Sequence, residues 1–347
     1  MCCIDDIFCW QDMNILLIKQ TSLGDVLHAS GHIRRVRKYY PDAHLTLLTS
    51  VGAADLFHYN PHIDELISFD RYWIKYQWFR HPIMCLRHGL EIMAKVRQRN
   101  YDLVIDLQGR WKTVLFLWGA RAKRRVVKGR WWFASRFHQP ELHAIEELDG
   151  VLGVAGLPRA DSQMEIHLSE KEVEFVNDQL GRAGIINKRL VVLSPMSRWP
   201  TKNWALQRYR ELCDGLPADC AVVVTGTEAE RSVISTHLTG LATQQVVNLA
   251  GQLSLLQLAE LMGRASVVIC GDSFPMHVAV ACSVPVVALF APTDERRVGP
   301  LSSESIVIRP EEGCDRCYRR RYCSNQCMTR IGVNKVSAAV KQVLGVA

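Results

Sequence analysis

The hydrophobic pattern of this chain alternates short apolar runs with longer segments in which apolar residues recur at helical spacing. The runs at 14–19, 44–50 and 189–195 are typical of parallel strands buried on both faces. Between such runs, segments such as 83–97 and 170–183 place apolar residues three or four positions apart. Because the two kinds of segment alternate, the pattern predicts an α/β protein with doubly wound parallel sheets.

The alternation stops at 156–170, "GLPRADSQMEIHLSE", and then starts again. We therefore predict two Rossmann-like domains, at 13–160 and 161–330, followed by a C-terminal helix within 331–347. Residues 1–12 lack a positively charged region followed by an apolar core, so they do not resemble a secretory signal. They are predicted to be a non-native or disordered start, with folding beginning at Met13.

The turn Gly271-Asp272-Ser273 follows a buried strand and opens a short helix, before a second strand at 286–290. The first N–H groups of a helix lack internal partners and attract phosphate, and glycine permits a close approach of the ligand. This predicts an anion or sugar-nucleotide site. An ordinary crossover turn with Ser273 as the N-cap remains the alternative.

Two more turns after strands carry polar residues. In "KQTSLGDVLH", Asp25 lies at the opening of a helix, where a carboxylate serves either as a general base or only to stabilise the helix dipole. The turn "LSPMSRWPTKNW" is predicted to bind a diphosphate without a metal, or else to cap the next helix. Its hydroxyl-bearing and cationic residues are Ser194, Ser197, Arg198, Thr201 and Lys202.

The net charge of +7 is concentrated in one part of the chain. Residues 71–138 contain 16 Lys and Arg against three acids, together with six of the nine tryptophans. A basic, aromatic segment favours an anionic partner such as a phosphorylated glycolipid or a membrane surface. A solvated face whose aromatics serve the core is the alternative, and no recognised nucleic-acid motif is present. The longest apolar stretch is too short to span a membrane.

The chain has 12 cysteines and no export signal, which favours reduced thiols in the cytoplasm over a disulfide framework. Four of them, Cys314, Cys317, Cys323 and Cys327, lie close enough in sequence to hold a structural zinc or iron, with reduced thiols or a local disulfide as the alternative. Three histidines lie on predicted helices, where a structural role is the usual one. They are His28, His32 and His277.

Several motifs occur in an order that resembles glycosyltransferase family 9, the ADP-heptose:lipopolysaccharide heptosyltransferases. They are "TSLGDVLH", "DLQGRWKTVLFLWGARAKRRVV", "HAIEELDGVLGVAGLP", "SPMSRWPTKNW" and the long run from "NLAGQLS" to "FAPTDE", followed by the cysteines. The resemblance extends from about residue 14 to the C-terminus. It implies a GT-B fold, with two Rossmann-like domains facing across a cleft, and inverting transfer of a heptose.

The resemblance also assigns roles to residues. It implies that Asp25 is the general base, that Lys202 binds the diphosphate and that Asp272 holds the donor sugar. Phe274 departs from the family pattern because it stands where a glycine is usual. The donor site is expected to comprise Ser194, Ser197, Thr201, Lys202, Glu228 (or Glu230), Leu253, Gly271, Asp272, Ser273 and His277. The acceptor site is expected to comprise Ser22, Arg110, Lys112, Arg121, Arg124 and Lys128.

The resulting hypothesis is a cytoplasmic, peripheral membrane glycosyltransferase. It would move a heptose from ADP-heptose to the lipid A-linked inner core at the inner membrane, with no cofactor in catalysis and no nucleic-acid partner. One alternative is a family 9-like transferase with another nucleotide sugar or acceptor. The other is a non-catalytic, basic protein that binds a polyanion or a membrane and carries a cysteine-metal module.

Overall fold

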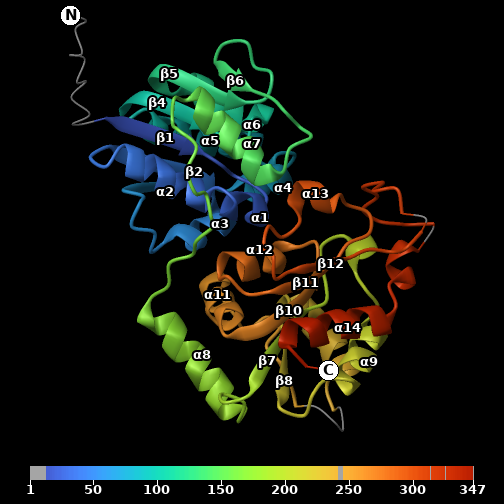
Figure 1. Ribbon diagram of the computed structural model, residues 1–347. Helices are drawn as coiled ribbons and strands as arrows, with labels where there is room; N and C mark the ends of the chain where they lie inside the picture. Colours follow the sequence, from blue (N-terminus) through green and yellow to red (C-terminus); the bar gives the residue numbers. More distant parts are fainter. Residues whose placement is uncertain (1–12, 241–244, 313, 325, 347) are drawn as a thin grey trace, which may run out of the picture. The chain divides into compact units, whose positions relative to one another are not determined.

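The computed structural model describes residues 13–240, 245–312, 314–324 and 326–346. The chain forms two compact units that divide between Met164 and Glu165 (Figure 1). The predicted non-native or disordered start, with Cys2, Cys3 and Cys9, lies outside the described residues.

The first unit contains one six-stranded parallel sheet and its helices. The strands are β1 (Asn14–Ile18), β2 (His44–Ser50), β3 (Glu65–Phe69), β4 (Asn100–Asp106), β5 (Arg121–Lys128) and β6 (Ser135–Phe137). The helices are α1 (Leu23–Leu27), α2 (Ser30–Tyr39), α3 (Val51–Ala54), η1 (Asp55–Phe57), α4 (Arg71–Gln77), α5 (Pro82–Val96), α6 (Trp111–Gly119) and α7 (Ala144–Val154).

The second unit repeats this plan. Its strands are β7 (Arg189–Ser194), β8 (Cys220–Val224), β9 (Val246–Asn248), β10 (Ala265–Gly271), β11 (Val286–Leu289) and β12 (Ile306–Ile308). Its helices are α8 (Glu170–Arg182), η2 (Pro200–Lys202), α9 (Leu206–Asp214), α10 (Glu228–Leu238), α11 (Leu255–Gly263), α12 (Phe274–Ala281), α13 (Glu295–Val298), η3 (Cys327–Arg330) and α14 (Val333–Leu344).

Both sheets have the strand order of a doubly wound Rossmann sheet. The first is ordered β3-β2-β1-β4-β5-β6 and the second β12-β11-β10-β7-β8-β9, so each unit places its own first and fourth strands side by side. Every strand pair is parallel, which explains the continuous apolar runs: β1 and β7 are almost wholly buried. The prediction of two Rossmann-like α/β domains is confirmed.

The elements that were not predicted from the sequence include α4, β5, β6 and β12. The sequence of β5, "RAKRRVVK", is dominated by cations, and only Val126 and Val127 are fully buried. Two of its arginines donate to backbone carbonyls: Arg124 to those of Val154 and Ala155, and Arg125 to those of Leu117, Ala120 and Ala122. Hydrophobic periodicity cannot detect such a strand, because its side chains are mostly polar and are stabilised by hydrogen bonds to carbonyl groups of other segments.

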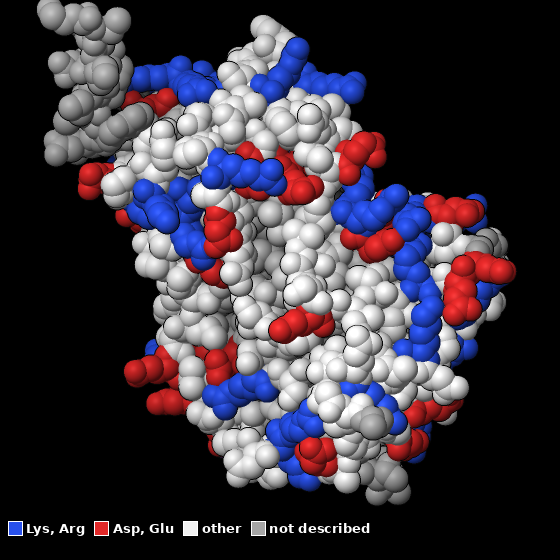
Figure 2. Space-filling model, viewed as in Figure 1, with Lys and Arg blue, Asp and Glu red and all other residues white. Residues whose placement is uncertain are grey.

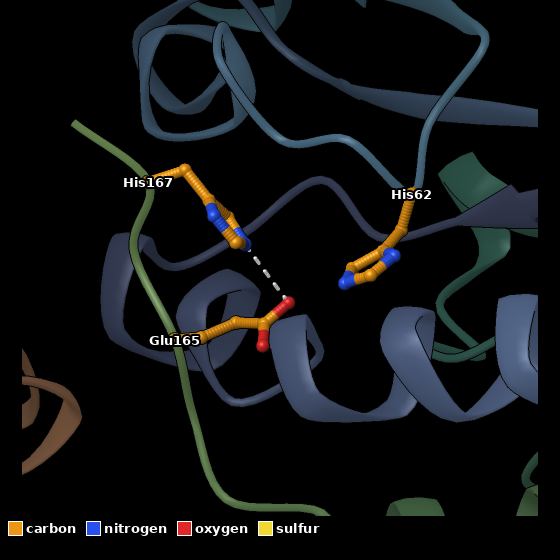
Figure 3. A group of neighbouring side chains, drawn as sticks. All are labelled: His62, Glu165 and His167. Carbon is orange, nitrogen blue, oxygen red and sulfur yellow. Dashed lines mark hydrogen bonds and ion pairs between the residues drawn. The ribbon is translucent and has the colours of Figure 1, made fainter. Parts of the chain in front are cut away.

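The segment between α7 and α8 contains no helix or strand. Within it, His167 Nε2 and Glu165 Oε1 lie 3.1 Å apart and form a hydrogen bond (Figure 3). His62, which the same view draws, belongs to the first unit.

The last helix, α14, is part of the core of the second unit. Val336 and Val340 are completely buried there, in the same apolar cluster as strands β7 and β10. Its N-terminal approach is fixed by Trp204, whose Nε1 donates to the carbonyl of Ile331 at 2.9 Å.

Candidate active site

In each unit, several candidate residues lie just beyond the carboxyl ends of the two central strands of the sheet. In the first unit these strands are β1 and β4, and in the second β7 and β10. The strand order reverses at these points, and open α/β sheets bind ligands there. Sequence reasoning selected the turns after β1, β7 and β10. The fold shows in addition that the turn after β4, which precedes the predicted acceptor residue Arg110, is paired with the turn after β1.

Asp25 lies in the first turn of α1 and is half-buried. Its Oδ2 accepts hydrogen bonds from the backbone N of Ser22 at 2.8 Å and from the Ser22 hydroxyl at 2.7 Å. Burial alone would raise the pKa of Asp25, but the positive charge of Lys19 and the two hydrogen bonds outweigh it and lower the pKa to about 2. The carboxylate is therefore ionised and held in one orientation at neutral pH.

Lys19 and Asp106 are buried charges beneath this turn. Lys19 is 5% exposed, and its Nζ lies 3.4 Å from the carbonyl of Leu107. Burial lowers the pKa of Lys19 to about 8, although the nearby charge of Asp25 acts in the opposite direction. Asp106 is completely buried, and burial raises its pKa to about 6. Neither residue was predicted as a site residue. Their positions in the sequence, at or just after the end of a central strand, are the feature that could have identified them.

Gln108 links the turns after β1 and β4. Its Oε1 accepts from the backbone N of Gln20 at 2.8 Å and of Thr21 at 2.9 Å, and its Nε2 donates to the Thr21 hydroxyl at 3.0 Å. One side chain thus fixes the loop that precedes Ser22 and Asp25. Sequence reasoning missed Gln108, because its partners are more than eighty positions away.

The predicted acceptor residues have different surroundings in the first unit. Ser22, Arg110, Lys112 and Arg121 are exposed. Arg124 donates to the carbonyls of Ala155 at 3.0 Å and Val154 at 2.6 Å, at the end of α7.

Lys128 forms an ion pair with the buried Glu147, with Nζ and Oε2 2.5 Å apart. Arg124 and Lys128 therefore already have structural partners.

A shallow hollow of about 480 Å³ lies beside these residues, lined by Gly129, Arg130, Arg136 and His138. Figure 2 shows Lys and Arg side chains along the margin of the first unit that carries β5 and β6. Part of the basic charge predicted from the sequence therefore lies on a surface with room for an anionic group.

The central contact of the second unit is an ion pair between Lys202 and Asp272. Lys202 Nζ lies 2.5 Å from Asp272 Oδ2 and 3.2 Å from the Asp272 carbonyl oxygen, and both side chains are nearly buried. Nζ also lies 4.3 Å from the centroid of the Trp199 ring. The structure thus brings together two residues, seventy positions apart, that the resemblance assigned to donor binding.

Gly271, the last residue of β10, lies against the backbone of η2. A Cβ at this position would lie 2.9 Å from the carbonyl oxygen of Lys202, a distance that real Cβ atoms essentially never show. The glycine therefore permits the approach that places Lys202 against Asp272.

Side chains between positions 194 and 203 fix the conformation of the loop that joins β7 to η2. Asn203 Oδ1 accepts from the backbone N of Ser197 at 2.8 Å and from its hydroxyl at 3.0 Å. Thr201 Oγ1 donates to the carbonyl of Arg319 at 2.6 Å. Ser194 is buried, with its Oγ 2.5 Å from Thr225 Oγ1. The loop is therefore pre-shaped, which reduces the ordering cost of binding a ligand.

The remaining donor candidates lie at helix starts. Glu230 Oε2 accepts from the backbone N of Thr227 at 2.7 Å and so belongs to the capping box of α10, whereas the Glu228 side chain is 71% exposed. This difference favours Glu228 over Glu230 for a ligand. Leu253 is half-buried just before α11.

Ser273 is the N-cap of α12, which has Pro275 in its first turn. His277 is buried within the same helix. Phe274 is the first residue of α12, so the departure from the family pattern falls at a helix start.

The four C-terminal cysteines do not form a complete tetrahedral site. Cys323 and Cys327 have their Sγ atoms 3.6 Å apart, which suits two ligands of one metal, but no three of the four sulfur atoms lie within 4.8 Å of one another. Cys314 Sγ donates to the carbonyl of Ala291 at 2.6 Å, and Cys317 is exposed. Burial, with hydrogen bonding to Cys314 and Cys323, raises the pKa of Cys327 to about 12. A structural zinc or iron stays a prediction, and nothing below depends on it.

Comparisons with known proteins bear on this arrangement. The model of glycosyltransferase family 9 (heptosyltransferase) matches residues 90–329. The chain belongs to this family. It is therefore a glycosyltransferase, and the alternative of a non-catalytic, polyanion-binding protein was wrong.

Two curated relatives illustrate the similarity. The lipopolysaccharide core heptosyltransferase OpsX of Haemophilus influenzae is 23% identical over 85% of this chain and 84% of its own length. Lipopolysaccharide heptosyltransferase 1 of Pseudomonas aeruginosa is 25% identical over 96% of this chain and 98% of its own length.

Solved structures of heptosyltransferases share the fold. E. coli ADP-heptose lps heptosyltransferase II superposes with a TM-score of 0.75 at 22% identity, covering 96% of this chain and 98% of that one. E. coli heptosyltransferase WaaC with ADP gives a TM-score of 0.72 at 20% identity, covering 95% of this chain and 100% of that one. The expectation of the GT-B architecture of two Rossmann-like domains is thus confirmed.

Proposed function

We propose that this family 9 enzyme transfers a heptose from ADP-heptose to the inner core of lipopolysaccharide, with inversion at the anomeric carbon. The observation that carries the proposal is the arrangement at the two sheet switch points: an oriented, ionised Asp25 in one unit, and the Lys202–Asp272 pair in the other. The names of the relatives, which specify lipopolysaccharide heptosyltransferases, support the donor sugar and the acceptor class.

In the proposed reaction, an acceptor hydroxyl gives its proton to Asp25. Its oxygen attacks the anomeric carbon of the donor, and the bond from that carbon to the diphosphate oxygen breaks. ADP leaves with the electron pair. A carboxylate with a pKa of about 2 is a weak base in the free protein. We therefore expect proton transfer to follow C–O bond formation, when the attacking oxygen has become far more acidic.

Lys202 and the N–H groups at the start of α12 are proposed to stabilise the charge that develops on the diphosphate. Lys202 already lies against Asp272, so a bound diphosphate would share the ammonium group with that carboxylate. Ser197 and Thr201 shape the loop around the diphosphate, and the exposed Glu228 with Leu253 is proposed to contact the nucleoside. This scheme needs no catalytic metal.

The acceptor is proposed to bind the first unit. The cationic hollow at Arg130, Arg136 and His138, and the exposed Arg110 and Lys112, supply positive charge for a phosphorylated glycolipid. Because that acceptor is linked to lipid A, the enzyme is proposed to work in the cytoplasm in peripheral contact with the inner membrane.

The decisive experiment replaces Asp25 by Asn. The amide keeps an oxygen for the Ser22 hydrogen bonds but cannot accept the proton, so we expect kcat to fall by about 10²- to 10⁴-fold. Binding of ADP, measured by calorimetry, should stay within about twofold of wild type. Near-normal turnover of Asp25→Asn would remove Asp25 as the base.

A panel of ADP- and UDP-sugars tests the donor. Preferential turnover of ADP-heptose supports the proposal. Preference for another nucleotide sugar would favour the alternative of a family 9 transferase with a changed donor site, for which Phe274 at the start of α12 is the residue to examine.

A further inference from the structure

The outer faces of helices α4, α5 and α6 expose an unusual amount of apolar surface. Phe79, two residues after the end of α4, is 93% exposed, Ile83 of α5 81% and Trp118 of α6 70%. These helices adjoin one another in the first unit, with α5 between α4 and α6. Large exposed apolar patches on a globular protein mark interaction sites.

Helix α5 has two separate apolar faces. Cys85, Ile92 and Val96 are buried and face the sheet. Ile83, Leu86 and Leu90, which follow helical spacing on another face, are each more than half exposed. A surface helix needs only the first of these faces to fold. The second face has no partner within the described part of the chain.

Helix α6 repeats this arrangement. Its inner positions, such as Val114 and Leu117, are buried, while Trp111, Leu115 and Trp118, spaced by four and three residues, are exposed. Trp111 also lies beside a cation, with Lys112 Nζ 5.2 Å from its ring. Tryptophan beside lysine is typical of the region where a bilayer meets water.

The charge around these helices selects the kind of partner. Residues 76–100 and 110–119 contain seven Lys and Arg, all exposed, and one acid, Glu91. Glu91 is itself paired with Arg87, at 3.0 Å. Apolar side chains surrounded by cations complement anionic lipid, whereas the cores of protein interfaces are depleted in charge and in lysine.

We propose that α4, α5 and α6 form a docking surface for an anionic lipid bilayer, with their exposed apolar side chains inserted at the level of the headgroups. No helix among the described residues is long and apolar enough to cross a membrane. The proposed contact is interfacial because the exposed apolar side chains lie on the outer faces of helices whose inner faces pack on the sheet. The inference deepens the proposed function, since it rests on a lipid-linked acceptor, and it assigns the membrane contact to particular helices.

The test uses the full-length protein and co-sedimentation with vesicles of phosphatidylethanolamine and phosphatidylglycerol. The variant combines Phe79→Ser, Ile83→Ser and Trp118→Ser, one change for each of the three helical segments. A matched control combines Leu301→Ser and Tyr322→Ser, which remove exposed apolar side chains from the second unit. Circular dichroism and urea midpoints verify that both proteins are folded.

We expect the triple variant to partition at least about tenfold less onto these vesicles, and the control to bind like wild type. Replacing phosphatidylglycerol by phosphatidylcholine, or substituting Arg80→Gln with Arg87→Gln, should also weaken binding by about tenfold. Unchanged vesicle binding by the triple variant overturns the inference. A wild-type dimer in light scattering that the triple variant abolishes, with vesicle binding unaltered, would instead identify a second copy of the chain as the occupant.

Transfer to a detergent-dispersed acceptor separates this inference from the proposed function. Normal transfer in detergent by a protein that never binds vesicles would overturn the docking surface alone. Vesicle binding without any heptose transfer would overturn the proposed function alone.

Discussion

At the scale of single residues, two buried ionisable side chains, Lys19 and Asp106, lie near the candidate base Asp25. Asp106 is completely buried at the end of β4, near the buried Lys19. Its Oδ1 accepts hydrogen bonds from the backbone N of Gln108 and Gly109, each at 2.9 Å. These bonds fix the turn that carries Gln108, and Gln108 in turn fixes the loop before Asp25. Asp106 is thus a positioning residue, two contacts away from the proposed chemistry.

The raised pKa of Asp106 predicts a particular dependence of stability on pH. Its pKa is about 6 in the folded protein, against 3.8 as the ordinary value. A raised pKa means that the folded state holds the proton more tightly, so the associated stability is full below about pH 4 and lost as the pH rises through 6. This lowers the free energy of unfolding by about 3 kcal/mol.

Urea unfolding of wild type and Asp106→Asn between pH 4 and 7 measures this effect. Asparagine keeps the acceptor oxygen but has no titratable proton. As the pH rises from 4 to 7, the free energy of unfolding of wild type should therefore fall relative to that of Asp106→Asn. A constant difference would show that Asp106 does not titrate there.

The Lys202–Asp272 pair predicts a non-additive result. Lys202→Ala leaves the nearly buried Asp272 carboxylate without its cation, so we expect the free energy of unfolding to fall by about 2–4 kcal/mol. Adding Asp272→Asn to Lys202→Ala should recover part of that loss, because the unpaired charge disappears. Denaturant melts of the four proteins in the cycle check this, and strictly additive effects would contradict it.

Lys202→Ala should also weaken donor use. We expect ADP binding to weaken by about tenfold or more, and acceptor affinity to remain unchanged. An effect confined to the acceptor would show that donor binding has been assigned to the wrong unit.

At the scale of elements, the donor site depends on how closely β10 approaches η2. The Lys202 carbonyl is 2.9 Å from the position of a Cβ at residue 271, so Gly271→Ala must push η2 away from the strand. We expect about 1–3 kcal/mol less stability, together with weaker ADP binding. Gly263→Ala, at the end of α11, is the matched control, since its nearest neighbour would lie 4.0 Å away. Equal behaviour of the two variants would contradict the close approach.

Element prediction from the sequence succeeded where burial on both faces made it unambiguous. The runs that became β1, β2, β7 and β8 are apolar throughout because helices cover both sides of a parallel sheet. It failed at β5, where Arg124 donates to carbonyl groups at the end of α7 and two lysines pair with carboxylates. That compensation depends on tertiary neighbours, so no local pattern contains it.

At the scale of the whole molecule, each unit has its own sheet and its own apolar core. If ADP binds as proposed, it should protect only the second unit. Hydrogen exchange with and without ADP should show slower exchange at 194–203 and 271–276, and no change at the turns after β1 and β4. Protection confined to the first unit would reverse the proposed assignment of donor and acceptor.

The sequence by itself determined the number and kind of sheets, because buried parallel strands demand apolar runs. It also placed the turns that carry Asp25, Lys202 and Asp272 after strands. It also located the basic segment between 71 and 138. Only the tertiary structure decided which of these polar residues meet. Lys202 forms an ion pair with Asp272, and Gln108 forms hydrogen bonds between two turns that are distant in sequence. Arg124 and Lys128 bind structural partners within the first unit. The physical reason is that hydrogen bonds and ion pairs form between residues far apart in sequence, which strand order brings together and local periodicity does not record.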